Sequence, residues 1–223
     1  MTALLQAIEF NTGHDPVGAV IWMHGLGADG SDFMPIVKEL GLPDHLPLRF
    51  IFPHAPMRAV TINAGHVMRA WYDIIEISSV ERKVDEAGIR ESQRAIDELI
   101  EREISRGIAA NRIILAGFSQ GGAIALQTGL RCKQALAGIL ALSTYLPLAA
   151  SLAAEASSAN RAIPIFMAHG EQDTVIPISI AESSVKELRR NGYKVDWREY
   201  PMAHSVSMEE ISDIGTWLKQ RVE

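Results

Sequence analysis

Residues 117–121 (GFSQG) constrain the fold of this chain more than any other stretch. They fit the pattern Gly-x-Ser-x-Gly and lie between a strand-like apolar run, Arg112 to Ala116, and a small-residue helical run, Gly122 to Leu130. Such a context predicts a sharp strand-to-helix turn, in which the two glycines give the backbone room to fold tightly. The turn would expose the hydroxyl of Ser119, which makes this serine a candidate nucleophile.

A serine hydroxyl is a weak nucleophile and needs a general base, which in turn needs an acid that orients it. In the α/β-hydrolase order, the acid and then the histidine follow the serine along the chain, each in a loop after a strand. His204 fits this order because it follows the strand-like run Val195 to Tyr200, whereas His169 precedes every acid of its own loop. We therefore expect His204 to be the base.

The loop after His169 offers two carboxylates as the acid. Asp173 precedes an apolar pair, Val175 and Ile176, where a carboxylate can be buried against an imidazole. Glu171 directly follows a turn glycine and is expected in solvent. Asp173 is the preferred acid, with Glu171 as the alternative and Asp196, inside an expected strand, as a third option.

Acyl transfer also needs hydrogen-bond donors for the developing oxyanion. One is expected from the backbone N–H of Gln120, the residue after the nucleophile. A second is expected from the N–H of Leu26, because the loop His24 to Gly27 follows an apolar strand and its glycines let the backbone turn an N–H inward.

The same loop carries a competing signal, because residues 25–30 fit the dinucleotide-binding pattern Gly-x-Gly-x-x-Gly. That reading needs a ribose-binding Asp or Glu about 20 residues further on, at the end of the next strand. The expected strand Leu48 to Phe52 ends instead in Pro53-His54-Ala55-Pro56. We interpret the glycines as an oxyanion loop and keep a redox function only as a remote alternative.

Composition indicates a single globular domain over residues 1–223, with 48% hydrophobic and 22% charged residues. The net charge of −6 argues against a general nucleic-acid surface. No apolar stretch approaches the ~20 residues of a membrane span, and the first residues lack the features of a secretion signal, so we expect a cytoplasmic protein. The histidines lack metal-ligand spacing, and neither a metal nor a cofactor is expected.

Strand-like and helical segments alternate along the chain, which predicts a mostly parallel sheet with helices on both faces. The expected strands are Val17 to Met23, Leu48 to Phe52, Arg112 to Ala116, Gly138 to Leu142, Ile163 to Ala168 and Val195 to Tyr200. Helices are expected near Ser31, over Gly88 to Arg106, Gly122 to Leu130 and Ser179 to Asn191, and after Ser207. Right-handed crossovers place the loops that follow the strands at one edge, where the four site segments would meet.

Five motifs in this order carry a family resemblance: HGLGADGSDF (24–33), PHAP (53–56), AWYDI (70–74), GFSQGG (117–122) and HGEQD (169–173). With them the chain resembles the phospholipase/carboxylesterase family of α/β-hydrolases. The resemblance implies the α/β-hydrolase fold with a minimal lid, Ser119, Asp173 and His204 as catalytic triad, and Leu26 and Gln120 as oxyanion donors. It also implies a homodimer.

The main functional expectation is a carboxylesterase that acts on small acyl esters, because the stretch Met68 to Ile74 is closer to the bacterial carboxylesterases of that family. Acyl-protein thioesterase or lysophospholipase activity on longer chains is the alternative, and a non-catalytic ligand-binding protein is a third reading. An apolar acyl groove is expected from Ile74, Ile75, Tyr145 and Leu146, while Ile77 fits the groove and ordinary packing equally well.

Overall fold

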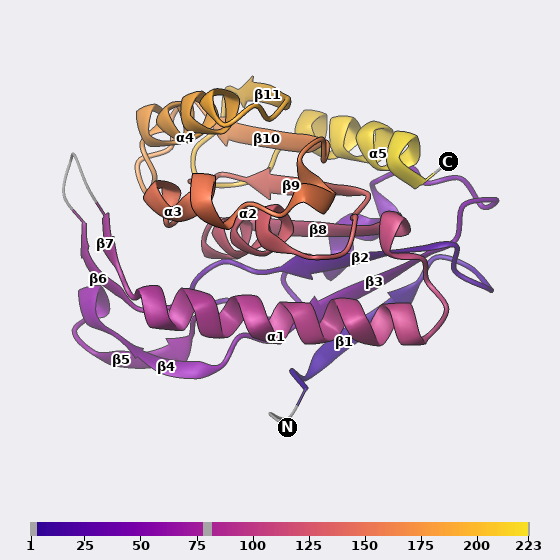
Figure 1. The fold of residues 1–223 in the computed structure, drawn as a ribbon, viewed down its shortest axis with the longest axis horizontal. Coiled ribbons are helices and arrows are strands. Elements are labelled where there is room, and N and C mark those ends of the chain that lie inside the picture. The colour runs from indigo at the N-terminus through magenta and orange to yellow at the C-terminus, as the bar shows by residue number, and fades with distance from the viewer. Residues whose placement is uncertain (1–3, 78–81, 223) are drawn as a thin grey trace.

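The computed structural model describes residues 4–77 and 82–222, except for the side chains of residues 77–84. Its centre is a seven-stranded sheet in the order β1-β3-β2-β8-β9-β10-β11 (Figure 1). The strands are β1 Ala7–Asn11, β2 Gly18–Met23, β3 Leu48–Pro53, β8 Ile113–Phe118, β9 Gly138–Leu142, β10 Ile165–Gly170 and β11 Val195–Tyr200. Only β1 runs antiparallel to its neighbour, so the expected mostly parallel sheet is confirmed.

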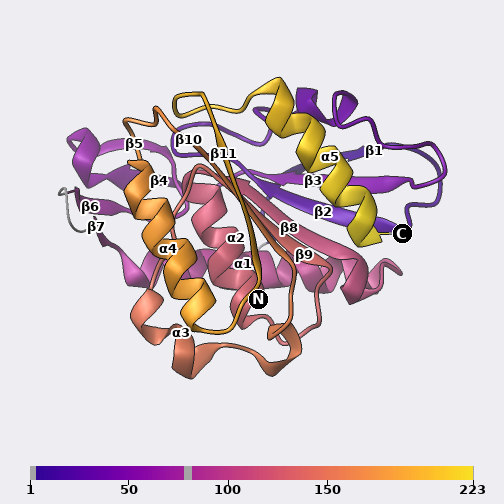
Figure 2. The same ribbon diagram turned by 90° about the horizontal axis from the view of Figure 1, so that it is seen from above.

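Helices cover both faces of the sheet, as Figure 2 shows. One face packs against α1 Glu86–Ser105, α2 Gln120–Arg131, α3 Ala149–Glu155 and α4 Ile178–Arg190. The other packs against α5 Met208–Val222 and the short 3-10 helix η1 Met34–Lys38. Among these described helices, none is long and apolar enough to cross a membrane.

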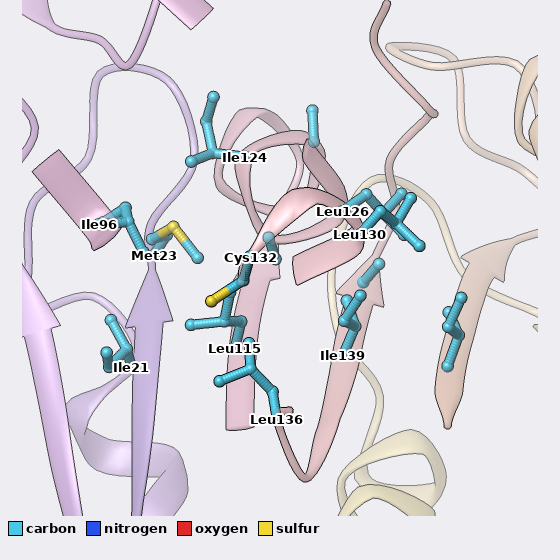
Figure 3. Packing of buried hydrophobic residues seen from close by; sticks show 14 of the residues in the cluster. Ile21, Met23, Ile96, Leu115, Ile124, Leu126, Leu130, Cys132, Leu136 and Ile139 are labelled. Atoms are coloured by element: carbon cyan, nitrogen blue, oxygen red, sulfur yellow. The ribbon is translucent and has the colours of Figure 1, made fainter. Parts of the chain in front are cut away.

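The central strands are apolar along their whole length because both of their faces are buried. In β2, Ile21 and Met23 belong to the core on the α1/α2 side, while Val20 and Trp22 belong to the core on the α5 side. Figure 3 shows the first of these cores, with Leu126 and Leu130 of α2 reaching toward β9. Helix α2 is therefore held firmly against the sheet.

The long connection between β3 and α1 is more structured than the sequence suggests. It contains two antiparallel hairpins and a single turn of 3-10 helix: β4 Met57–Val60 with β5 His66–Arg69, β6 Ile74–Ile77 with β7 Arg82–Val84, and η2 Thr61–Asn63. These strands have three or four residues each, too few for a clear alternating pattern to mark them in the sequence.

Several expected helix boundaries need correction. The helix expected near Ser31 is wrong, because the first helical turn is η1 and starts at Met34. The Ala/Ser-rich segment after Leu148 folds as α3 followed by the 3-10 turn η4 Ser158–Asn160, and another such turn, η3 Ala110–Arg112, leads into β8. The remaining expected helices and strands are found within two residues of their expected starts.

A buried carboxyl lies in the first turn of α5. Glu210 is fully buried, and within residues 4–77 and 82–222 neither of its carboxyl oxygens has a hydrogen-bond partner of good geometry, although its own N–H donates to Ser207 Oγ. Burial raises the pKa of Glu210 to about 8, opposed by the Ser207 backbone and reinforced by the nearby Asp213 carboxylate. The folded protein therefore favours the protonated form of Glu210.

This carboxyl makes stability depend on pH. Because the folded pKa of about 8 exceeds the ordinary value of 4.5, the carboxyl destabilises the fold progressively as the pH rises between these two values. The variant Glu210→Gln should therefore exceed the wild type in free energy of unfolding by about 1–3 kcal/mol near pH 8 and by much less near pH 5. Urea denaturation at both pH values, with the exposed neighbour Glu209→Gln as control, tests this. An equal shift at both pH values would contradict it.

Candidate active site

Ser119 occupies a strained turn between β8 and α2 (Figure 1). Its backbone has φ +54° and ψ −118°, in the positive-φ region that residues other than glycine rarely adopt. The turn is held by two hydrogen bonds, from Ser119 N–H to Leu142 O at 2.8 Å and from Thr144 Oγ1 to Ser119 O at 2.6 Å.

The two flanking glycines are required by close backbone contacts. A Cβ on Gly117 would lie 2.3 Å from the carbonyl of Gly121, and a Cβ on Gly121 would lie 2.2 Å from the carbonyl oxygen of Met23. Both separations are far shorter than atoms tolerate, so only glycine fits at either position. The glycines thus allow α2 to start directly beside the end of β2.

The imidazole of His204 lies between Ser119 and Asp173. Its Nε2 is 2.9 Å from Ser119 Oγ, and its Nδ1 is 2.6 Å from Asp173 Oδ2. The ring of Phe118 packs against the imidazole with their centroids 4.8 Å apart. The structure therefore brings together the three side chains that the sequence singles out, although they come from separate loops.

Asp173 is buried and accepts several hydrogen bonds. Its Oδ1 accepts from the backbone N–H groups of Val175 and Ile176, both at 2.8 Å. Burial alone would raise the pKa of this carboxyl, but hydrogen bonds from His169, His204 and the Ile176 N–H outweigh burial and hold the pKa well below its usual range. Asp173 is thus a fixed negative charge beside the imidazole.

The two alternative acids lie elsewhere. Glu171 is exposed to solvent, as its position after the turn glycine predicts. Asp196 is also exposed, and its carboxylate pairs with Arg198 Nε at 3.0 Å. Neither carboxylate contacts His204 in a hydrogen bond or ion pair among residues 4–77 and 82–222.

His169 is a residue of the site that the sequence analysis sets aside. It is fully buried at the end of β10, and its Nε2 lies 2.7 Å from Ile176 O and 3.3 Å from Asp173 Oδ2. The N–H at Nε2 is thus shared between two acceptors, with the shorter contact to the Ile176 carbonyl and the longer one to the Asp173 carboxylate. Its place directly at the end of a strand, beside the acid loop, is the one sequence signal that could have indicated this role.

The loop that carries Leu26 is clamped by His24. The backbone N–H of Ala55 donates to His24 Nε2 at 3.0 Å, so the ring proton is on Nδ1, which lies 2.7 Å from Gly25 O. Burial lowers the pKa of His24, which keeps the ring neutral. A further bond joins Gly27 N–H to Arg69 O at 2.9 Å. The loop is therefore fixed on both sides of Leu26.

Gln120 is the first residue of α2, so its N–H is among the helical amides that have no acceptor within the helix. Gln120 and Leu26 line the same cavity as Ser119. The buried Gln120 side chain also ties the site to the hairpin region, because it accepts from Trp71 N–H and donates to Tyr72 O, both at 2.7 Å. The sequence predicts a role only for the backbone N–H of Gln120, so its side-chain contacts with Trp71 and Tyr72 were not foreseen.

The cavity beside Ser119 has a volume of about 360 Å³ and is mostly apolar. Two of the predicted groove residues line it, Ile74 and Tyr145. Tyr145 forms a hydroxyl–hydroxyl contact of 2.8 Å with Tyr72, which also lines the cavity. The apolar lining residues not foreseen from the sequence are Ala28, Ile62, Phe118, Val175 and Ile176. We refer to this space as the acyl cavity.

Two other predicted groove residues do not line the acyl cavity. Ile75 is 40% exposed and follows Ile74 in strand β6, where successive side chains point in opposite directions. Leu146 is buried in the core, and its N–H donates to Ser184 Oγ of α4 at 2.9 Å. The side chain of Ile77 lies outside the described residues.

The glycine-rich loop of residues 25–30 packs against the end of β3. The N–H of Gly30 donates to His54 Nδ1 at 3.1 Å, and a Cβ at Gly30 would lie 2.3 Å from Phe52 O. Its close approach to the end of β3 explains the glycine. Within residues 4–77 and 82–222, no three His, Cys, Asp or Glu side chains gather as they would around a metal ion.

Known proteins resemble this chain over nearly its whole length. The profile of the phospholipase/carboxylesterase family matches residues 8–222. The chain is 39% identical over 210 residues to acyl-protein thioesterase 1 of Yarrowia lipolytica, an alignment that covers 92% of each chain.

Solved structures share the fold. Arabidopsis thaliana SOBER1 superposes with a TM-score of 0.88 at 29% identity, covering 92% of this chain and 99% of that one. Acyl-protein thioesterase 2 of Zea mays superposes with a TM-score of 0.85 at 25% identity, covering 98% of this chain and 100% of that one. The expected α/β-hydrolase fold is thereby confirmed.

The variant Asp173→Asn tests the buried carboxylate. Its amide oxygen can still accept from Val175 and Ile176, but its NH2 group then faces His204 Nδ1, where the carboxylate accepts a hydrogen bond. We expect the free energy of unfolding at neutral pH to fall by about 1–3 kcal/mol. Because the folded pKa lies below the unfolded one, this difference from the wild type should shrink as the pH falls below about 4.

Chemical denaturation across this pH range measures the effect, with the exposed Asp44→Asn as a matched control. Proton NMR provides a second readout, because the downfield signal of the His204 Nδ1 proton should disappear in Asp173→Asn. A variant with wild-type stability and an unchanged imidazole signal would show that Asp173 does not hold the ring.

Proposed function

Since the chain belongs to the phospholipase/carboxylesterase family of α/β-hydrolases, we propose that this hydrolase cleaves acyl thioesters through Ser119, His204 and Asp173. The observation that carries the proposal is the unbroken line of contacts Ser119 Oγ–His204 Nε2 and His204 Nδ1–Asp173 Oδ2, at 2.9 Å and 2.6 Å. This line ends at the wall of the acyl cavity, where an acyl chain can be buried.

In the proposed mechanism, His204 Nε2 removes the Ser119 proton while Ser119 Oγ attacks the acyl carbon. The negative oxygen of the tetrahedral intermediate accepts hydrogen bonds from the N–H groups of Leu26 and Gln120. The carbon–sulfur bond then breaks, the sulfur takes the proton from the imidazolium, and an acyl-enzyme remains on Ser119. His204 next activates a water molecule that hydrolyses this ester and frees the serine.

Asp173 has two roles in this proposal. Its negative charge stabilises the imidazolium that forms in each step, and its bond to Nδ1 keeps Nε2 directed at Ser119. His169 is a positioning residue, because it contacts Asp173 and Ile176 but not the nucleophile. The lowered pKa of Asp173 keeps the carboxylate ionised throughout the cycle.

The proposed thioester substrate reverses the ranking from the sequence, which puts carboxylesterase activity first and thioesterase activity second. Carboxylesterase activity was the main expectation, but the relatives at 34–41% identity are named acyl-protein thioesterases, which favours the alternative. The serine chemistry is the same for both leaving groups, so ester hydrolysis is expected as a second activity. A single domain over residues 1–223, a homodimer and a cytoplasmic location stay predictions from the sequence.

Removing the nucleophile tests the mechanism. The variant Ser119→Ala should lower kcat for thioester hydrolysis by up to about a millionfold, leaving only the effect of binding and of the oxyanion donors. Release of thiol from a short acyl thioester measures this, and circular dichroism checks that the variant is folded. A variant that keeps most of the activity would refute the assignment, and a wild type with no hydrolysis would favour the non-catalytic reading.

The acyl cavity predicts a dependence on chain length. Each buried methylene contributes about 0.8 kcal/mol, or roughly fourfold in affinity, until the cavity is full. For S-acyl N-acetylcysteine thioesters from butyryl to palmitoyl, kcat/KM should therefore rise and then level off. Tyr145→Trp, which enlarges a lining side chain, should move the plateau to shorter chains, while Ile75→Val outside the cavity should not. A flat series, or equal effects of both variants, would contradict the assignment of the cavity.

A further inference from the structure

A second cavity also has His204 in its lining. It has a volume of about 500 Å³ and lies between η1 and the segment that follows His204. Its apolar walls include Phe33, Ile36, Val206 and Ile211. Asp32, Phe118 and His204 line both this cavity and the acyl cavity, whereas Ser119, Leu26 and Gln120 line only the acyl cavity. We refer to the second space as the η1 groove.

Acyl transfer places the acyl chain and the leaving thiol of a substrate in different spaces. The acyl carbon must lie beside Ser119 Oγ and the two oxyanion donors, which places the acyl chain in the acyl cavity. The leaving sulfur must lie within reach of His204 Nε2, because it takes its proton from that atom. The rest of the leaving thiol then extends away from the acyl chain, and the η1 groove is the space that starts at His204.

The charges of the η1 groove are one-sided. Asp32 and Glu39 line it, and none of its described lining residues is a lysine or an arginine. Within residues 4–77 and 82–222, neither carboxylate takes part in an ion pair or a side-chain hydrogen bond.

Some other carboxylates of the chain are paired with cations, as Glu155 is with Arg90 and Arg131. Asp32 is exposed, but partial desolvation and the neighbouring Asp29 carboxylate raise its pKa.

We infer that the η1 groove binds the leaving thiol and selects one with an apolar body and a positive charge. This inference rests on the proposed thioester hydrolysis. The apolar walls would cover the body of the thiol, and Asp32 and Glu39 would attract its cationic end. The substrate class this chemistry describes is an acylated cysteine next to a basic side chain. The acyl chain is recognised separately, in the acyl cavity.

A matched pair of thioesters isolates the charge. S-butyrylthiocholine carries a trimethylammonium group, and S-(3,3-dimethylbutyl) thiobutyrate has the same shape with a neutral carbon in place of the nitrogen. Both form the same butyryl-enzyme, so differences between them arise before or during acylation. The ratio of their kcat/KM values is measured by thiol release for the wild type and for the double variant Asp32→Asn/Glu39→Gln. Intrinsic differences between the two thiols cancel when the ratios are compared.

We expect the preference for the cationic substrate to fall by about three- to tenfold in this double variant, since two partly exposed charge contacts are removed. The wild-type preference should also weaken at about 0.5 M salt, where charges are screened over a few ångströms. The control is Glu101→Gln/Glu182→Gln, which removes an exposed carboxylate of α1 and a half-buried carboxylate of α4, neither of which lines the groove. Its ratio should equal that of the wild type.

Different results would overturn the role of the η1 groove and the proposed thioester hydrolysis. An active double variant with an unchanged ratio, or a control variant with the same loss, would overturn the role of the η1 groove and leave thioester hydrolysis intact. A wild type that hydrolyses neither thioester would refute the proposed function and this inference with it.

Discussion

The contact between Gly121 and the end of β2 is the constraint on which the rest of the site depends. Because no side chain separates Gly121 from Met23 O, α2 begins directly against β2, and Ser119 is forced into a positive-φ turn. The same closeness brings Gly25 against Ser119, since a Cβ at Gly25 would lie 3.6 Å from that of the serine. Ser119 and the loop that carries Leu26 are thus held close together, and the packing of α2 against the sheet offsets the backbone strain at Ser119.

The acid–base side of the site depends on a different kind of interaction. His204 lies in a loop, but its ring is held at both nitrogens and by Phe118, and Asp173 is in turn held by two backbone amides and by His169. Side chains that are hydrogen-bonded in series restrict one another's rotation, as the proposed proton transfer would require. Glu210 differs, because its buried carboxyl oxygens have no hydrogen-bond donor of good geometry in the part of the chain that the structure describes, and its pKa is raised.

The sequence predicted the parts of this structure that depend on strong local signals. Long apolar runs marked the central strands, and the order of Ser119, Asp173 and His204 along those strands implied their meeting at one edge. It did not predict β1 or the two hairpins, whose strands are short and partly exposed. Nor did it place Ile75 and Leu146 correctly, because which way a side chain points depends on register and tertiary packing rather than on composition. His169 was missed since its role arises only from contacts across the acid loop.

The proposed hydrolysis requires that His204 activate Ser119. The most direct measurement is labelling with a fluorophosphonate, followed by mass spectrometric mapping of the adduct in the wild type and in His204→Ala. We expect a single adduct to form rapidly on Ser119 in the wild type, and labelling to be slower by orders of magnitude in the variant. An adduct on another residue, or equal rates in both proteins, would contradict it.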